Sequence, residues 1–373
     1  MKKTLNINAV REALTEKGLT QKDLANSIGV APQAVTNWMK EKGFPRPAAL
    51  LKLATTLQLN FKELVLTSDE DSPVVAFRKK AGTKTTEKHL AKADSIGKLL
   101  KPLVPYLNEV KALRTLITSP STDYEKIQVA ASQTRERLGI GENAVLEYEH
   151  LIGEFKNCGA ILVPVLWGIR GNHENALHIR LPKEDVTFIF LNLETRLEDF
   201  KFWMAHELAH VYTPILCGTN EGEDFADALA AALLFPRSCA EIAYRELSQA
   251  TRTTEASKLQ QYAAAYQISL NTVYQQVNAY AKSVGCPILR TAEKTIHAIR
   301  NTNCGSLVSE ALFDPVPPEP KLYISACEHA FQSDFFNALT RMIHENGTSS
   351  SYIQQVLDTS MQDAYAIHEG LSH

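Results

Sequence analysis

The pentapeptide His-Glu-Leu-Ala-His at 206–210 has the residue types and spacing of a metal-binding helix. Residues four apart lie one turn apart on the same helix face, so His206 and His210 can both reach one ion. Glu207 stands beside them, where a carboxylate can take a proton from metal-bound water and pass it to a leaving amine. Because the chain has eleven histidines, a chance match has a probability on the order of a few per cent, and the motif needs support from elsewhere.

The stretch EGEDFADALAAALLFP, shortly downstream, provides that support. A catalytic zinc site uses three protein ligands and leaves one position open for water. Glu223 is the predicted third ligand, and Asp227, one turn later, is predicted to accept the outer N–H of a ligand histidine. Two alternatives stay open. Asn220 and Glu223 also fit a capping box that needs no metal, and Glu221 is a substitute ligand.

Two helices, at 196–213 and 221–234, are expected to carry these side chains, because both stretches show apolar residues at helical spacing. Twelve residues separate His210 from Glu223, a short connection that a tight turn through Gly218 can close. Short runs rich in Val, Ile, Leu and Phe precede the first helix and predict a small sheet. These runs are AILVPVLW, ALHIRL and VTFIFLN.

Other side chains near this region are weaker candidates for stabilising an oxyanion. Tyr212 lies just past the motif, and partial burial against the sheet is the expectation for it. His173 and His178 lie in GNHENALHIRL, beside a strand that can hold a substrate peptide by edge pairing. For these two histidines a solvated loop position is expected.

The stretch GLTQKDLANSIGVAPQAVTNWMKEKGFPRP near the N-terminus has the pattern of two short helices joined by a sharp turn. Thr20 is the expected cap of the first helix, and Gly29 can take the positive φ of the turn. Pro32 suits the first turn of the second helix, which is expected to bury Val35 and Trp38.

This burial leaves polar residues of the second helix on the surface. Gln and Asn can pair with adenine in the major groove, and Lys can reach phosphate. Residues 1–66 hold ten Lys and Arg against five Asp and Glu, a balance that suits a phosphate backbone. A helical bundle used for protein contact or dimerisation is the alternative. The predicted DNA contacts are Gln21, Gln33, Thr36, Asn37 and Lys40.

The whole chain predicts an α+β, predominantly helical protein in four parts. They are a helix-turn-helix domain at 1–66, a linker and helical arm at 67–120, a core with a small β-sheet at 121–237, and a helical C-terminal region at 238–373 whose role stays open. No apolar run reaches the ~18 to 20 residues of a membrane span. The N-terminus lacks a secretory signal and the six cysteines form no CxxC pair, so a cytoplasmic protein is expected.

Two family resemblances rest on these motifs. Residues 7–65 resemble the phage-repressor-like Xre family, although MKEKGFPRP departs from its usual loop. KFWMAHELAH followed by EDFADALAAALLFP resembles the ImmA/IrrE metallopeptidase family, and the similarity covers about 124–237. Ala209 and Leu229 stand where Gly and Phe are usual in that family.

The second resemblance implies a zincin-like core in which zinc is held by His206, His210 and Glu223, with Glu207 as general base. It implies a DNA-binding regulator with zinc endopeptidase activity in a stress, phage or mobile-element response. The expected partners are double-stranded operator DNA, a repressor or antitoxin-like substrate protein, and a second copy of the chain. The chain's own segment at 67–90 is another expected substrate. The alternative is a non-catalytic repressor or antitoxin-like module whose peptidase fold senses or binds a partner.

Overall fold

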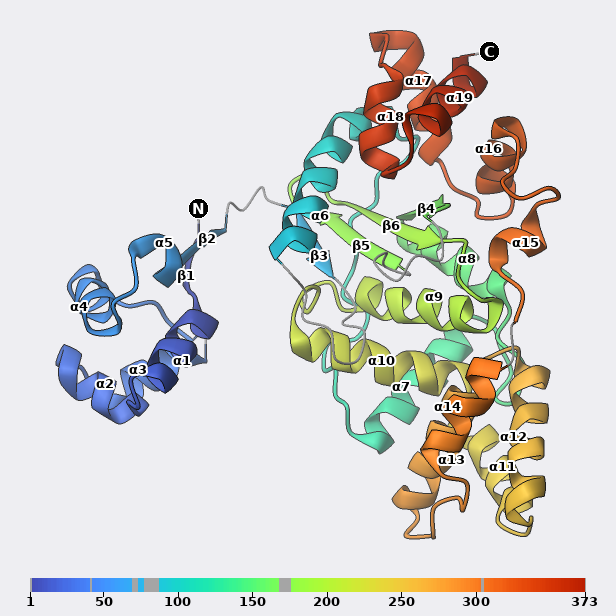
Figure 1. Cartoon of the computed structure of the whole chain (residues 1–373), viewed down its shortest axis with the longest axis horizontal. Helices are drawn as coiled ribbons and strands as arrows, with labels where there is room; N and C mark the ends of the chain where they lie inside the picture. The colour runs from blue at the N-terminus through green and yellow to red at the C-terminus, as the bar shows by residue number, and fades with distance from the viewer. Residues whose placement is uncertain are drawn as a thin grey trace. The chain divides into compact units, whose positions relative to one another are not determined.

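The computed structural model describes residues 2–40, 42–68, 73–76, 87–167, 176–302 and 305–372. The chain divides into two compact units, Met1–Ser72 and Pro73–His373 (Figure 1). No helix among the described residues has the length and apolar character needed to cross a membrane.

The first unit is a small helical bundle closed by a short antiparallel ribbon. Strand β1 (Lys2–Leu5) pairs with β2 (Val65–Ser68), so the first residues of the unit lie beside its last ones. These strands were not predicted from the sequence, because each has only four residues. The helices are α1 (Ile7–Glu16), α2 (Gln21–Ile28), α3 (Pro32–Met39), α4 (Pro47–Leu57) and α5 (Phe61–Leu64).

Local signals set the turn between α2 and α3. The Thr20 side chain accepts from the backbone of Asp23, whose carboxylate accepts in return from the Thr20 backbone. Gly29 ends α2 with a φ of 77°, and Pro32 opens α3. Val35 and Trp38 are buried. The predicted cap, turn and buried face of the helix-turn-helix are therefore confirmed.

The described strands of the second unit form a mixed sheet in the order β3-β5-β6-β4. Strands β4 (Ala160–Val165), β5 (Ala176–Leu181) and β6 (Val186–Asn192) coincide with the three predicted apolar runs. A fourth strand, β3 (Val74–Ala76), was not predicted from the sequence and pairs antiparallel with β5. This edge strand comes from the segment that was expected to be a linker.

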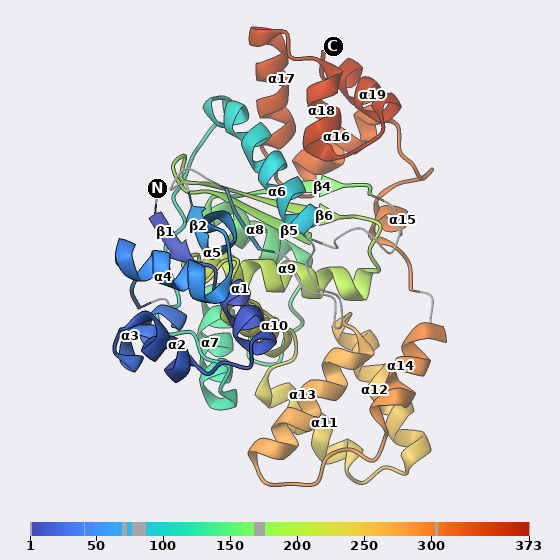
Figure 2. The same ribbon diagram turned by 60° about the vertical axis from the view of Figure 1, so that its left-hand side comes forward.

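Helices cover both faces of this sheet (Figures 1 and 2). Helix α9 packs on β5 and α8, and α10 packs on α9 and α7. On the opposite face, α6 packs on β3 and β5, and α17 packs on β4. These helices are α6 (Glu87–Leu100), α7 (Tyr124–Arg137), α8 (Tyr148–Cys158), α9 (Leu197–Tyr212), α10 (Asn220–Leu234) and α17 (Phe335–Asn346).

The remaining helices form two groups on either side of the sheet and α9 (Figures 1 and 2). One group is α11 (Arg237–Leu247), α12 (Arg252–Tyr266), α13 (Leu270–Ser283) and α14 (Glu293–Thr302). The other group includes α16 (Pro320–His329), α18 (Ser350–Leu357) and α19 (Met361–Ser372), with α15 (Val308–Leu312) leading to it. The prediction of a helical C-terminal region is confirmed.

One continuous apolar core joins the three parts that the sequence analysis separated after residue 66. Ile96 and Leu100 of the expected arm are buried in it together with Phe188 of the sheet and Phe335 of the C-terminal region. The helical arm expected within 67–120 is therefore part of the core, because the apolar face of α6 covers the sheet.

The guanidinium of Arg135 fixes the end of α10 against α7. This buried side chain donates from Nη1 to the Leu233 carbonyl and from Nη2 to the Gly141 carbonyl, each at 2.7 Å. The first hydrogen bond satisfies a carbonyl that the end of α10 leaves without an intrahelical partner, and the second joins it to the loop after α7. Helix α10, which carries Glu223 and Asp227, is thus held at both its face and its end.

Candidate metal centre and recognition helix

Helix α9 holds His206 and His210 on its buried side. Both imidazoles have no measurable exposure, and their Nε2 atoms lie 3.2 Å apart. At this distance one Nε2 can donate to the other, or both lone pairs can be directed at one shared cation.

Glu223 on α10 completes the group. Its Oε2 lies 3.5 Å from Nε2 of His206, and its Oε1 lies 3.3 Å from Nε2 of His210. Tetrahedral zinc with bonds of about 2.0 to 2.1 Å places its ligand atoms about 3.3 Å apart. The two Nε2 atoms lie 3.2 Å apart, and each lies 3.3 to 3.5 Å from one of the two Glu223 oxygens, so the separations are of the size that a shared zinc ion requires.

The donor set also fits a divalent metal chemically. Both carboxylate oxygens of Glu223 are buried and have no hydrogen-bond partner in the described part of the chain. Its contacts in the described part of the chain are with the imidazoles of His206 and His210. A divalent cation would be bound by this carboxylate together with the two Nε2 atoms. Among the described residues, His206, His210 and Glu223 form the cluster with metal-ligand geometry.

Asp227 orients one of the histidines. Its Oδ1 lies 2.9 Å from Nδ1 of His206, the relationship expected for a carboxylate that accepts the outer N–H of a ligand. This hydrogen bond leaves the Nε2 lone pair directed at the cluster. Burial lowers the pKa of His206, but the contacts with Asp227 and Glu223 outweigh it and raise the pKa to about 9 in the metal-free protein.

The cluster holds Glu223 in its ionised form. Burial raises the pKa of this carboxyl, but the contacts with His206 and His210 outweigh burial and lower the pKa to about 2. An ionised carboxylate is the form that coordinates a metal.

The turn between α9 and α10 settles the two alternatives for Glu223. Thr219 caps α10, and its hydroxyl accepts from the Gly222 backbone at 3.0 Å. The interpretation of Asn220 and Glu223 as a capping box is therefore wrong, because the cap lies one residue earlier. Glu221 is exposed and lies outside the cluster. Gly218 has a φ of 78°, which provides the tight turn that the short connection required.

Glu207 lies beside the cluster, 3 % exposed. Its Oε2 is 3.3 Å from Nδ1 of His178 on β5. The expectation of a solvated loop for His178 is wrong, because β5 begins at Ala176 and buries His178 completely against α9. Burial lowers the pKa of His178, which favours a neutral imidazole next to Glu207. His173 lies outside the described residues.

Tyr212 does not point toward the cluster. Its hydroxyl donates to Oε1 of Glu154 at 2.9 Å, and the side chain is buried. The expectation of burial is confirmed. The two positions that depart from the ImmA/IrrE pattern, Ala209 and Leu229, are buried together in a small apolar cluster between α9 and α10.

In the first unit, α3 presents the predicted DNA-reading side chains. Gln33 is exposed, and its Nε2 donates to Oδ1 of Asn37 at 3.1 Å. Thr36 is half-buried and donates to the carbonyl of Pro32. The Asn37 side chain therefore positions Gln33 on the surface of α3.

Gln21 and Lys40 mark the ends of the predicted surface. Gln21 is exposed at the start of α2, and Lys40 is exposed directly after α3. Both side chains are free to extend toward a phosphate backbone or a base edge.

Comparison with known proteins agrees with the geometry of this unit. Residues 10–64 match the helix-turn-helix family. The first unit is an Xre-type helix-turn-helix domain. This domain indicates a DNA-binding transcription regulator. No curated protein and no solved structure matches the chain.

The position of Lys40 predicts how DNA binding depends on salt. We expect Lys40→Ala to weaken binding to any duplex sequence and to reduce the slope of log K against log salt concentration by about one, because one phosphate contact is lost. Fluorescence anisotropy with a random-sequence duplex at several salt concentrations measures this. Lys98→Ala, a change of an exposed lysine in the second unit, is the control, and an equal loss of slope in both variants would contradict the assignment.

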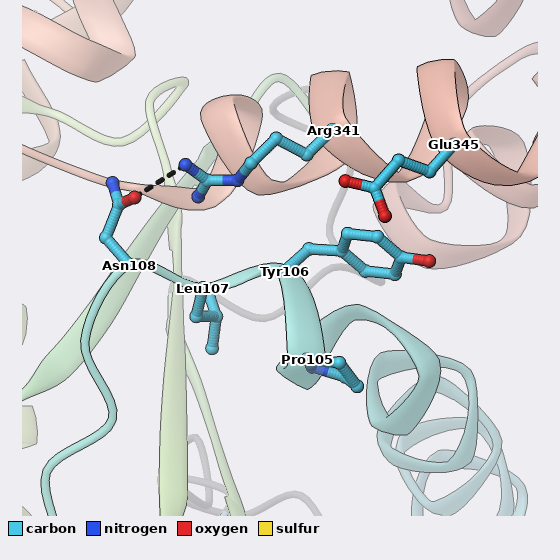
Figure 3. Close-up of a pocket in the computed structure, with 6 residues that line it drawn as sticks. All are labelled: Pro105, Tyr106, Leu107, Asn108, Arg341 and Glu345. Atoms are coloured by element: carbon cyan, nitrogen blue, oxygen red, sulfur yellow. Dashed lines mark hydrogen bonds between the residues drawn. The ribbon is translucent and has the colours of Figure 1, made fainter.

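A separate pocket of 380 Å³ lies between Tyr106 and α17 (Figure 3). Arg341 projects toward it, but its guanidinium donates to Oδ1 of Asn108 at 2.5 Å and lies 3.2 Å from Asp334. The contact between Arg341 and Asn108 joins the segment after α6 to helix α17. We therefore assign Arg341 a structural role. The pocket is lined by Pro105, Tyr106, Leu107, Asn108, Arg341 and Glu345.

Proposed function

We propose that the chain is a DNA-binding transcription regulator whose second unit is a zinc-dependent endopeptidase. The observation that supports this is the convergence of His206, His210 and Glu223 at separations of 3.2 to 3.5 Å. A buried group of two imidazoles and one carboxylate, with a second carboxylate beside it, is the donor set of peptidases that leave one zinc position open.

The proposed roles follow from the positions of the side chains. His206, His210 and Glu223 would hold the zinc ion, and Asp227 would keep His206 in the tautomer that coordinates through Nε2. Zinc supplies a Lewis acid that lowers the pKa of a bound water and polarises a carbonyl. Glu207 would accept a proton from that water and deliver it to the nitrogen of the leaving amine. His178 would hold the Glu207 carboxylate toward the cluster through its Nδ1.

The proposed substrate is a helix-turn-helix repressor or an antitoxin-like protein. The resemblance to ImmA/IrrE enzymes supports this class, and so does the presence of an Xre-type domain on the same chain. The chain's own segment at 67–90 is a second proposed substrate, since residues 74–76 form a strand next to β5.

One feature favours the alternative, a non-catalytic module that binds a partner through this fold. His206 and His210 are buried and Glu207 is 3 % exposed, so these side chains have little contact with solvent in the state described. Zinc content distinguishes the two alternatives. Stoichiometric zinc would support the endopeptidase, and purified protein that lacks zinc but still binds DNA would support the non-catalytic module.

Hydrolysis is tested by incubating the full chain, and the repressor-like protein of a neighbouring gene, with zinc or with zinc and excess chelator. Mass spectrometry of the products is expected to show fragments that appear only with free zinc. Identical fragments from the parent and from Glu207→Gln would rule out self-cleavage by this site. Proteins that stay intact in every sample would rule out endopeptidase activity on these substrates.

A further inference from the structure

Strand β3 is an edge strand of the sheet and lies next to β5, the strand that carries His178 (Figure 1). It is antiparallel to β5, and Ala76 stands opposite His178 in the register. His178 is the residue whose ring reaches Glu207, at 3.3 Å, and contacts the ring of His210 edge-on. The main chain of β3 therefore passes one strand away from the cluster.

The other side of β3 faces the turn that joins the two ligand helices. A methyl group on Gly218 would lie 2.9 Å from the carbonyl oxygen of Val75, closer than normal packing allows. In an antiparallel strand the N–H and C=O of one residue point to the same side. Because Val75 faces Gly218, Val74 and Ala76 are the residues whose backbone groups face β5.

A second glycine accommodates the start of the same segment. A methyl group on Gly97 of α6 would lie 2.5 Å from Cβ of Pro73 and 3.3 Å from a methyl of Ile179 on β5. Gly97 and Gly218 thus leave room for an extended chain between α6, β5 and the turn. This slot, bounded by β5, Gly97 and Gly218, has the form of a groove for an added strand.

We infer that the slot is the peptide groove of the proposed endopeptidase and that the chain's own Pro73–Ala76 occupies it as an internal inhibitor. This inference rests on the proposed function. An extended peptide that adds a strand beside His178 has to take the place of β3, because only one strand can pair with that edge of β5. The substrate class is an extended segment with small or β-branched apolar residues like those of β3.

The inhibition is expected to be reversible, because the contact is short. Strand β3 has three residues, of which two face β5. A segment tethered to its own binding site has an effective concentration of about millimolar, so it excludes a weakly binding peptide without needing a tight interaction.

The test measures peptide binding and does not depend on hydrolysis. All variants carry Glu207→Gln so that no peptide is cut, and zinc is present. The probe is a fluorescein-labelled peptide with the sequence of residues 70–80, EDSPVVAFRKK. Val74→Pro with Ala76→Pro removes the two backbone donors that face β5, while Val74→Thr with Ala76→Ser keeps them and is the matched control.

Fluorescence anisotropy is expected to show at least about tenfold tighter peptide binding to the proline variant than to the control, and no gain with a scrambled peptide. Equal binding to both folded variants would overturn the inference. If circular dichroism shows that the double variant has lost helix, Ala76→Pro alone is compared with Ala76→Ser under the same criterion. Hydrolysis is measured separately, on the parent chain with Glu207 intact. Tighter peptide binding to the proline variant, with no zinc-dependent hydrolysis by the parent, would support the groove and rule out the endopeptidase. Hydrolysis by the parent with equal peptide binding to both variants would rule out only the groove.

Discussion

Replacing Glu207 with Gln is expected to leave zinc bound and to slow peptide-bond hydrolysis by about 10²- to 10⁴-fold, the usual contribution of a general base. Glutamine has nearly the same shape but cannot accept a proton from water. Glu207 is not one of the three converging donors, so metal content and thermal stability are expected to stay near those of the parent. The rate is measured on a peptide spanning a cleavage site mapped in the parent.

Glu221→Gln is the matched control for this variant. Glu221 is an exposed carboxylate, two residues before Glu223, and lies outside the cluster. It is expected to retain the parent rate. A Glu207→Gln protein that binds zinc and cleaves as fast as the parent would contradict the assignment of the general base.

Zinc is expected to raise the melting temperature of the parent, and His210→Ala is expected to abolish this effect. Binding to the folded state alone stabilises a protein by about 2.7 kcal/mol at a ligand concentration of 100 times Kd. For a unit of this size that corresponds to about 4 °C. His210 contributes its Nε2 within 3.3 Å of both other donors, and alanine leaves an incomplete site.

Differential scanning fluorimetry of chelator-treated protein, with and without added zinc, measures this difference. His344→Ala, at an exposed histidine on α17, is expected to keep the full zinc-dependent shift. Asp227→Asn is expected to bind zinc about 10- to 100-fold more weakly, because it weakens the hydrogen bond that orients His206. If zinc raised the melting temperature of His210→Ala as much as that of the parent, His210 would not be a zinc ligand.

Features specified by nearby residues were predictable from the sequence. The helix-turn-helix turn depends on Thr20, Gly29 and Pro32, each of which acts on backbone within a few residues of itself. The same holds for the spacing of His206 and His210 on one helix face. The closure between the ligand helices was also predictable, because Gly218 supplies a positive φ in a short connection.

Features that depend on contacts distant in sequence were not predictable. Strand β3 has three residues, too few for an alternating pattern, and it forms only because β5 offers an edge. The burial of His178 follows from the face that β5 turns toward α9, which the flanking sequence does not reveal. The joining of the C-terminal helices to the core likewise depends on packing between residues more than a hundred positions apart, such as Phe188 and Phe335.

The metal content of the purified full chain tests the central claim most directly. Protein prepared without chelators is analysed by plasma mass spectrometry, and its metal environment by X-ray absorption. The account predicts about one zinc per chain, bound by two imidazole nitrogens and a carboxylate oxygen at about 2.0 to 2.2 Å. Parent protein that stays free of metal after dialysis against zinc would contradict the proposed metal site. A His206→Ala variant that binds zinc as well as the parent would also contradict it.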